Sequence, residues 1–260
     1  MPLDRQIDIW IAEAEEIWLE KIHTHIKNLF STVFLPSHDQ THHRRVWNIA
    51  RSLLKEMALY DAMLDRSLVE GLLIATYFHD VGMVRSARED HGALGREICE
   101  SYFNEKGVIP FSRYSEALEA IELHDVKNME LSVSKTSRVP LSILDILSVA
   151  DDLEALGTIG IYRYIEIYLM RDSNLRNLGI RILGNANKRF ENLRIRCKDY
   201  PGLLTSYEAQ FSDLVSFFDN YNQQLLTEKK PESVYFGHLG VVNHIRTFSL
   251  EKHTMPMDLL

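Results

Sequence analysis

The chain has 260 residues, of which 45% are hydrophobic and 25% charged, and this composition is typical of a globular protein with a substantial core. A net charge of -8 argues against nucleic-acid binding as the main function, because surfaces that track phosphates carry clustered positive charge. Two cysteines are too few for a disulfide framework, and no apolar run approaches the ~20 residues that span a bilayer, so we expect a cytoplasmic protein without membrane contact.

Helical periodicity begins at the start of the chain. Residues 4–31 are expected to form one amphipathic helix that covers the core. Ser37 and Gln40 form a capping box that predicts the start of a second helix, and in this helix His42 lies one turn before Val46 on the apolar face. His42 is therefore expected to point inward.

The next helix carries the strongest functional signal. A second capping box, Ser67 with Glu70, opens an almost entirely apolar segment over residues 68–78, which is predicted to be buried on most sides. His79 and Asp80 end this helix, so an imidazole and a carboxylate are expected at the edge of the core. A buried carboxylate without a partner is costly, and Asp80 therefore needs one.

Two more histidines occupy inward-facing positions. His91 shares a helix face with Leu94 and Ile98, and His124 follows apolar residues at helical spacing, with Asp125 directly after it. Either the two imidazoles bind a second metal ion, or they act as proton donor and phosphate contact beside a single ion. The two-metal form is favoured, because both imidazoles lie on helix faces that must otherwise be dry.

Later in the chain, a helix begun by Pro140 carries an apolar stripe that Asp151 continues, so Asp151 is also expected to face the core. After a break at residues 172–174, Thr205 opens a helix that runs to about Leu226. The sequence shows no internal repeat, low-complexity segment or flexible linker. We therefore expect a single all-α domain over the whole chain, with helical elaborations at both ends.

Four of the inward-facing residues, which come from three helices, are most simply explained by a shared metal ion that satisfies all of them at once. Each one alone fits a hydrogen-bonded core histidine or a surface aspartate. Mixed imidazole and carboxylate ligands suit Mn, Fe, Co, Ni or Zn better than Mg or Ca. The four residues are His42, His79, Asp80 and Asp151.

Other clusters are less informative. Three aromatic residues fit either the core or a dimer face, so a homodimer stays open: Phe217, Phe218 and Tyr221. The remaining histidines show no comparable set and are expected to be surface or structural residues: His23, His25, His38, His43, His238, His244 and His253.

Three segments of the chain, residues 37–47, 75–80 and 150–163, resemble the signature blocks of the HD-domain metal-dependent phosphohydrolase superfamily, in the right order and spacing. Within it the chain is most similar to the small, stand-alone bacterial branch. The resemblance covers residues 37–165 and implies that they form the catalytic core of an HD-domain helical bundle. It also implies that the four residues above are the metal ligands.

The two-metal branches of the superfamily imply that His91 and His124 hold the second ion. The chain departs from its relatives in the last block, where they commonly have Asp-Ala-Asp-Arg and this chain has Val149 for the first Asp and Asp152 for the Arg. A positive charge expected near the site is thereby removed. The Gly-Tyr-Pro signature of the cyclic-dinucleotide branch is missing, which counts against that substrate.

Ligand set and resemblance together predict a metal-dependent phosphohydrolase that cleaves a phosphoester or phosphoanhydride of a small phosphorylated substrate, such as a nucleotide. A divalent ion lowers the pKa of a water molecule toward ~7 and so supplies hydroxide for attack on phosphorus. Arg45 and Arg163 are predicted to bind the substrate phosphate. His91, His124 or Asp125 is predicted to protonate the leaving oxygen.

Two functions of other classes remain open. A di-iron oxygenase similar to myo-inositol oxygenase uses the same ligand arrangement for O₂-dependent oxidation of carbon, and an air-dependent iron absorption band would favour it. A non-catalytic HD module would bind a nucleotide and a metal without turnover. The complete ligand set argues against this second alternative, because a degenerate module is expected to have lost a ligand.

Overall fold

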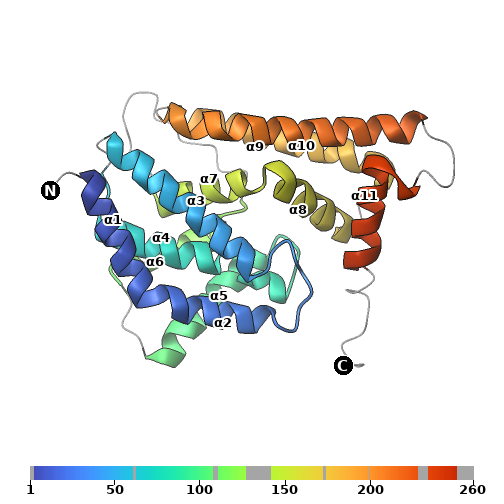
Figure 1. Cartoon of the computed structure of the whole chain (residues 1–260). Helices are drawn as coiled ribbons and strands as arrows, with labels where there is room; N and C mark the ends of the chain where they lie inside the picture. Colours follow the sequence, from blue (N-terminus) through green and yellow to red (C-terminus); the bar gives the residue numbers. More distant parts are fainter. Residues whose placement is uncertain are drawn as a thin grey trace. The chain divides into compact units, whose positions relative to one another are not determined.

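The computed structural model describes residues 3–60, 63–107, 111–126, 142–171, 174–198, 200–227 and 234–250. Within these ranges it contains helices and no strand, which confirms the all-α fold class expected from the sequence (Figure 1). None of the helices in the described part of the chain is both long and apolar enough to cross a membrane.

The chain divides into two compact units. Unit 1 comprises Met1–Val33 and His38–Asp151, and unit 2 comprises Phe34–Ser37 and Asp152–Leu260. The expectation of one domain over the whole chain stays a prediction.

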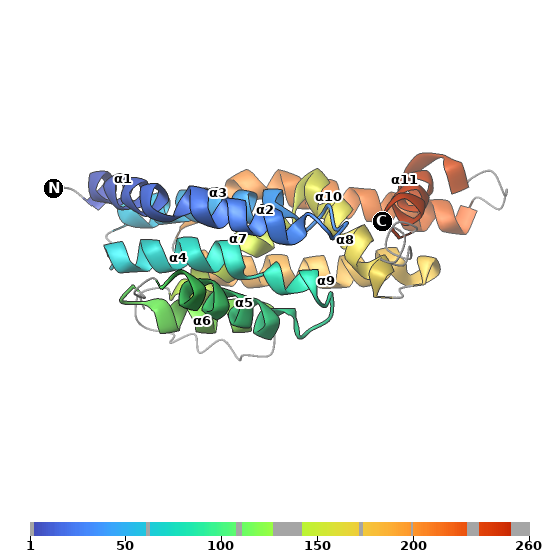
Figure 2. The same ribbon diagram turned by 90° about the horizontal axis from the view of Figure 1, so that it is seen from below.

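Unit 1 is built around a central helix, α4. This helix contacts α1, α2, α3, α5 and α6, and in Figure 2 it lies between the layer of α1–α3 and the layer of α5 and α6. Its central place explains why nearly every residue from Leu68 to Phe78 is buried, as the apolar composition predicts. The helices of unit 1 are α1 (Leu3–Ala14), α2 (Glu20–Phe30), α3 (Gln40–Leu59), α4 (Arg66–Phe78), α5 (His91–Lys106), α6 (Tyr114–Leu123) and most of α7 (Ile143–Glu154).

The amphipathic helix expected at the N-terminus is present as α1 and α2, which a π-helical segment, Glu15–Leu19, joins without a break. The residues of its inward face are apolar and recur every three or four positions, as an amphipathic helix requires. The buried residues of this face are Ile7, Ile11, Ala14, Trp18, Ile22, Ile26 and Phe30.

Aspartates, rather than the predicted serines, cap α3 and α4. The carboxylates of Asp39 and Asp65 each accept a hydrogen bond from a backbone N–H in the first turn of their helix, at 2.8 and 2.7 Å. The caps predicted at Ser37 and Ser67 are therefore wrong. A carboxylate at a helix N-terminus also gains from the helix dipole, which a serine hydroxyl does not.

Two glycines allow close approach of the elements around Asp80. A Cβ on Gly82 would lie 1.9 Å from the carbonyl oxygen of His91. A Cβ on Gly92 would lie 2.4 Å from the carbonyl oxygen of Glu122. Both distances are far below van der Waals contact, so only glycine fits. Gly82 thus brings the start of α5 to the segment after Asp80, and Gly92 brings α5 to the end of α6.

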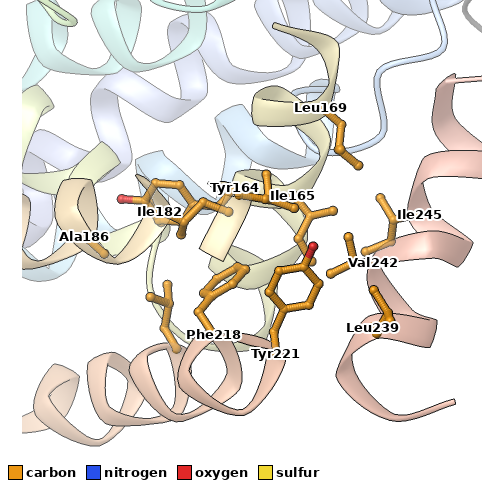
Figure 3. Packing of buried hydrophobic residues seen from close by; sticks show 13 residues of the cluster. Tyr164, Ile165, Leu169, Ile182, Ala186, Phe218, Tyr221, Leu239, Val242 and Ile245 are labelled. Carbon is orange, nitrogen blue, oxygen red and sulfur yellow. The ribbon is translucent and has the colours of Figure 1, made fainter. Parts of the chain in front are cut away.

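Unit 2 has a hydrophobic core of its own, in which side chains from α8, α9, α10 and α11 meet (Figure 3). Phe218 and Tyr221 are fully buried in this core, so they do not form a dimer face. Phe217 is partly buried and packs against the same core. The helices of unit 2 are α8 (Gly157–Met170), α9 (Leu175–Arg196), α10 (Pro201–Thr227) and α11 (Gly237–Ile245).

Two further helix starts differ from the prediction or cannot be compared with it. Helix α10 begins at Pro201, so the predicted cap at Thr205 lies inside the helix. Proline at the first helical position is favourable, because its missing N–H would have had no partner there. Pro140, predicted to begin α7, lies outside the described residues.

Candidate metal centre

The four predicted metal ligands come together in unit 1. His42 is the third residue of α3, His79 is the C-cap of α4, and Asp80 follows it directly. Asp151 lies in the last turn of α7, which ends at Glu154. One ligand atom from each of the four residues lies within 4.8 Å of all the others.

The distances between these atoms suit a single ion. His42 Nε2 is 3.1 Å from His79 Nε2 and 3.2 Å from Asp80 Oδ2. His79 Nε2 is 3.4 Å from the same oxygen. Asp151 Oδ1 is 3.7 Å from His42 Nε2 and 3.9 Å from His79 Nε2. Ligand atoms about 2.1 Å from one ion lie roughly 3 to 4 Å from one another, so this donor set fits a divalent transition metal.

Backbone carbonyls hold the histidine rings in the orientation that a metal requires. His79 Nδ1 lies 2.9 Å from the carbonyl oxygen of Thr76, three residues earlier. Because a carbonyl can only accept, Nδ1 carries a proton and donates it, so Nε2 is the nitrogen that faces Asp80 and is positioned to bind a metal. The orientation of His79 is therefore fixed by the last turn of α4 itself.

A second cluster lies beside the first. Asp80 Oδ1 is 3.3 Å from His91 Nε2 and 3.1 Å from His124 Nε2, and the two Nε2 atoms are 3.3 Å apart. Both rings donate from Nδ1 to the carbonyl three residues earlier, which is Arg88 for His91 and Ile121 for His124, at 2.6 and 2.8 Å. Three donor atoms thus converge, and they too could hold a metal ion.

Asp80 joins the two clusters. Its Oδ2 lies among the nitrogens of His42 and His79, and its Oδ1 lies among those of His91 and His124. The side chain is only 5% exposed. One buried carboxylate therefore offers a different oxygen to each cluster, which is the arrangement of a bridging ligand between two metal ions.

The electrostatics of the cluster depend on Asp80. Burial raises the pKa of Asp80, but the neighbouring His79, His124 and His42 outweigh burial and hold this pKa well below its usual value. Burial lowers the pKa of His79, whereas the charges and hydrogen bonds of Asp80 and Asp151 raise it to about 10. The pKa of His91 is also raised, because the hydrogen bond and charge of Asp80 outweigh burial. In the metal-free cluster Asp80 therefore stays ionised, and His79 and His91 each hold a proton more tightly than an isolated imidazole does.

Two histidines expected to be structural or on the surface are buried next to the site. His38 is 5% exposed, and its Nε2 lies 3.9 Å from Asp80 Oδ2. His43 is fully buried against the rings of His42 and His79, and burial together with these two rings holds its pKa well below 6.5.

A sequence signal for His43 exists and for His38 does not. His43 precedes Val46, Trp47 and Ala50 by three, four and seven residues, which is the spacing of one buried helix face, and all three are buried. His38 precedes α3, where helical periodicity gives no information. The structure shows that His38 directly precedes Asp39, the N-cap residue of α3.

The predicted substrate-binding arginines occupy different surroundings. Arg45 is half-buried on α3, one turn after His42, and its guanidinium donates to Thr41 Oγ1 at 2.9 Å. Arg163 belongs to unit 2 and forms a buried ion pair with Glu154. Asp125, the other candidate proton donor, is partly buried, and its charge contributes to the raised pKa of His91.

Asp152, at the position where the resemblance to the family implied an arginine, is not an isolated negative charge. Its Oδ1 lies 2.8 Å from Nη1 of Arg189 on α9, and both side chains are largely buried. Arg189 also lies over the ring of Tyr164, 5.9 Å from the ring centre. The negative charge introduced by Asp152 is therefore offset within unit 2.

Comparison with known proteins supports the family suggested by the sequence. Residues 40–156 match the family model described as HD domain. The matched segment contains both clusters, and members of this family are mostly metal-dependent phosphohydrolases. A search of curated proteins and a search of solved structures each gave no match. Residues 40–156 are therefore similar to the HD domain, as the sequence suggested.

Proposed function

We propose that this protein is a metal-dependent phosphohydrolase that acts on a small phosphorylated molecule such as a nucleotide. The observation that carries the proposal is the position of Asp80, whose two carboxylate oxygens lie 3.1–3.4 Å from four histidine nitrogens. Two-metal hydrolases use such a carboxylate to hold a pair of ions that together bind one phosphate.

His42, His79, Asp80 and Asp151 would hold the primary ion, a divalent transition metal. Asp80, His91 and His124 would hold a second ion. Bound metal supplies Lewis-acid chemistry: it lowers the pKa of a water molecule to about 7 and offsets charge on phosphoryl oxygens.

The side chains of the chain itself perform the remaining steps. Arg45, one turn after His42 on α3, donates hydrogen bonds to a phosphate oxygen. Asp125 follows His124 directly and would take a proton from the attacking water and pass it to the leaving oxygen, since His91 and His124 would be occupied as ligands. Arg163 is engaged by Glu154, so of the two predicted arginines Arg45 is the stronger candidate for the phosphate contact.

Elemental analysis of the purified protein, followed by a phosphate-release screen over nucleotides with Mn²⁺, Co²⁺, Ni²⁺ and Mg²⁺, tests this function. We expect one or two transition-metal ions per chain and metal-dependent release of phosphate from at least one substrate. The variant Asp80→Ala should lose both, whereas His244→Ala, which changes an exposed histidine of unit 2, should keep both. A metal-replete Asp80→Ala protein with full activity would refute the proposal.

The same purified protein also tests the two alternative functions, a di-iron oxygenase and a non-catalytic module. The histidine-rich donor set with a bridging carboxylate also suits two iron ions, so an oxygenase would show an iron absorption band that depends on air and consumption of O₂ without phosphate release. A non-catalytic module would bind metal and a nucleotide and release no phosphate with any of the four metals.

A further inference from the structure

The last turn of α7 carries Asp151, and the structure shows an unusual way of holding this turn. The helix ends at Glu154, so Asp151 is the fourth residue from its end. The last four carbonyl groups of any helix have no partner within the helix, and terminal turns therefore open more readily than the middle. The position of the Asp151 carboxylate depends on whatever fixes this turn.

Two arginines fix it. Asp152 Oδ1 lies 2.8 Å from Arg189 Nη1, with exposed fractions of 21% and 16% for the two side chains. Glu154 forms an ion pair with Arg163, and these side chains are only 3% and 8% exposed. Half of the residues in the last turn are thus held by largely buried ion pairs.

The directions of the two ion pairs matter. Successive residues of a helix are rotated by about 100°, so residues 152 and 154 project roughly 200° apart. Arg189 and Arg163 therefore hold the turn from nearly opposite sides, and together they restrict both its rotation and its unwinding.

The chain passes from unit 1 to unit 2 at this point. Asp151 is the last residue of its segment of unit 1, whereas Asp152, Glu154 and both arginines belong to unit 2. The helical backbone between residues 151 and 154 connects Asp151 with the residues that form the two ion pairs.

We infer that Arg189 and Arg163 are positioning residues for the metal ligand Asp151. By holding Asp152 and Glu154, they keep the last turn of α7 helical, and the helical turn places the Asp151 carboxylate near His42 and His79. The inference rests on the proposed metal centre and not on the reaction.

Co²⁺ binding to the full-length protein tests the inference, because the visible absorption of Co²⁺ reports the number and arrangement of its ligands. We expect Arg189→Met to weaken Co²⁺ binding on the order of 10- to 100-fold, as removal of groups that orient metal ligands commonly does, and to alter the spectrum at saturating Co²⁺. Arg194→Met is the matched control, because this arginine also lies on α9, over the ring of Phe190, and pairs with Glu191 instead of α7.

A reciprocal exchange distinguishes positioning from a general loss of stability. The double variant Asp152→Arg with Arg189→Asp restores the ion pair in reverse, so it should recover most of the Co²⁺ affinity and the native spectrum. Helical content measured by circular dichroism shows that each variant is folded. If Arg189→Met unfolds the chain, Arg189→Lys, which keeps the charge but lacks the planar fork, takes its place with a smaller expected loss.

The outcomes separate this inference from the proposed function. Folded Arg189→Met protein that binds Co²⁺ with unchanged affinity and spectrum overturns the positioning role and leaves the phosphohydrolase intact. Wild-type protein that binds Co²⁺ but releases no phosphate from any substrate overturns the function and leaves the positioning role intact. Wild-type protein that binds no Co²⁺ overturns both.

Discussion

His42 Nε2 and His79 Nε2 lie 3.1 Å apart, although 37 residues separate them in the sequence and both side chains are fully buried. Two imidazolium ions cannot share such a contact, because each would direct a proton at the other. One ring must accept while the other donates, and Asp80 stabilises the proton between them. A metal ion replaces that proton, so protons and metal compete for the same nitrogens.

Metal binding should therefore become tighter as the pH rises. The pKa of His79 is raised to about 10 in the metal-free protein, so this ring is protonated at neutral pH and must lose its proton to bind an ion. We expect Co²⁺ affinity to increase severalfold for each pH unit between pH 6 and 9, with release of protons. Calorimetric titration in two buffers of different ionisation enthalpy measures both quantities, and an affinity independent of pH would contradict the competition.

The free energy of unfolding of the metal-free protein should fall as the pH rises above 6.5, whereas metal affinity should increase. The pKa of His79 is raised above 6.5, so its contribution to the free energy of unfolding is present below pH 6.5 and is lost as the pH rises toward about 10. The pKa of Asp80 is lowered, so its contribution is present above about pH 4 and is lost as the pH falls further.

Urea unfolding of the metal-free and Co²⁺-loaded protein at several pH values checks this expectation. The metal-free protein should become less stable between pH 6.5 and 9, whereas the stabilisation by added Co²⁺ should grow over the same range. His79→Ala should flatten the high-pH decline of the metal-free protein. A metal-free protein whose stability rises steadily to pH 9 would show that His79 is not held protonated.

Metal stoichiometry should distinguish the residues of the two clusters. Asp151→Ala removes a donor from the first cluster only, and His124→Ala from the second only, so each should lower the metal content toward one ion per chain. Asp80→Ala removes a donor from both and should lower the content toward zero. Because each change removes a ligand and little core volume, helical content should stay near that of the wild type.

If His124→Ala keeps full metal content but loses phosphate release, His124 is instead an acid or a phosphate contact. Elemental analysis after dialysis, combined with circular dichroism, separates these results.

Gly92→Ala should damage the second cluster selectively. The added Cβ would lie 2.4 Å from the carbonyl oxygen of Glu122, so α5 and α6 must separate, and the histidines they carry must separate with them. We expect a loss of about 1–3 kcal/mol in the free energy of unfolding and weaker binding of the second ion. Gly184→Ala, where no atom lies within 4 Å of the new Cβ, is the control and should be neutral or stabilising.

Helical periodicity predicted the inward direction of His42 and Asp151, because each residue continues an apolar stripe. His79 and Asp80 were expected at the edge of the core because they end an almost entirely apolar helix, and the structure brings the four residues together. The same reasoning could not find His38, which lies before α3 and outside any helical period.

The ion-pair partners of charged residues also could not be predicted from the sequence. A helical pattern states which face a residue occupies, but the partner of Asp152 lies 37 positions away on α9, at a place set by the packing of unit 2. The helix starts show a related limit: serines at suitable spacing were present near the starts of α3 and α4, yet aspartates two residues away provide the caps.

The contact at Gly82 has a consequence for any attempt to transplant the paired clusters into another helical protein. The backbone after Asp80 lies so close to the carbonyl of His91 that no side chain fits between them, with a would-be Cβ only 1.9 Å from that oxygen. Copying the histidines and aspartates alone would leave α5 at an ordinary packing distance from the segment after Asp80. His91 would then lie too far from the Asp80 carboxylate. A designer would have to copy the glycines first, since they set the spacing that the ligands then use.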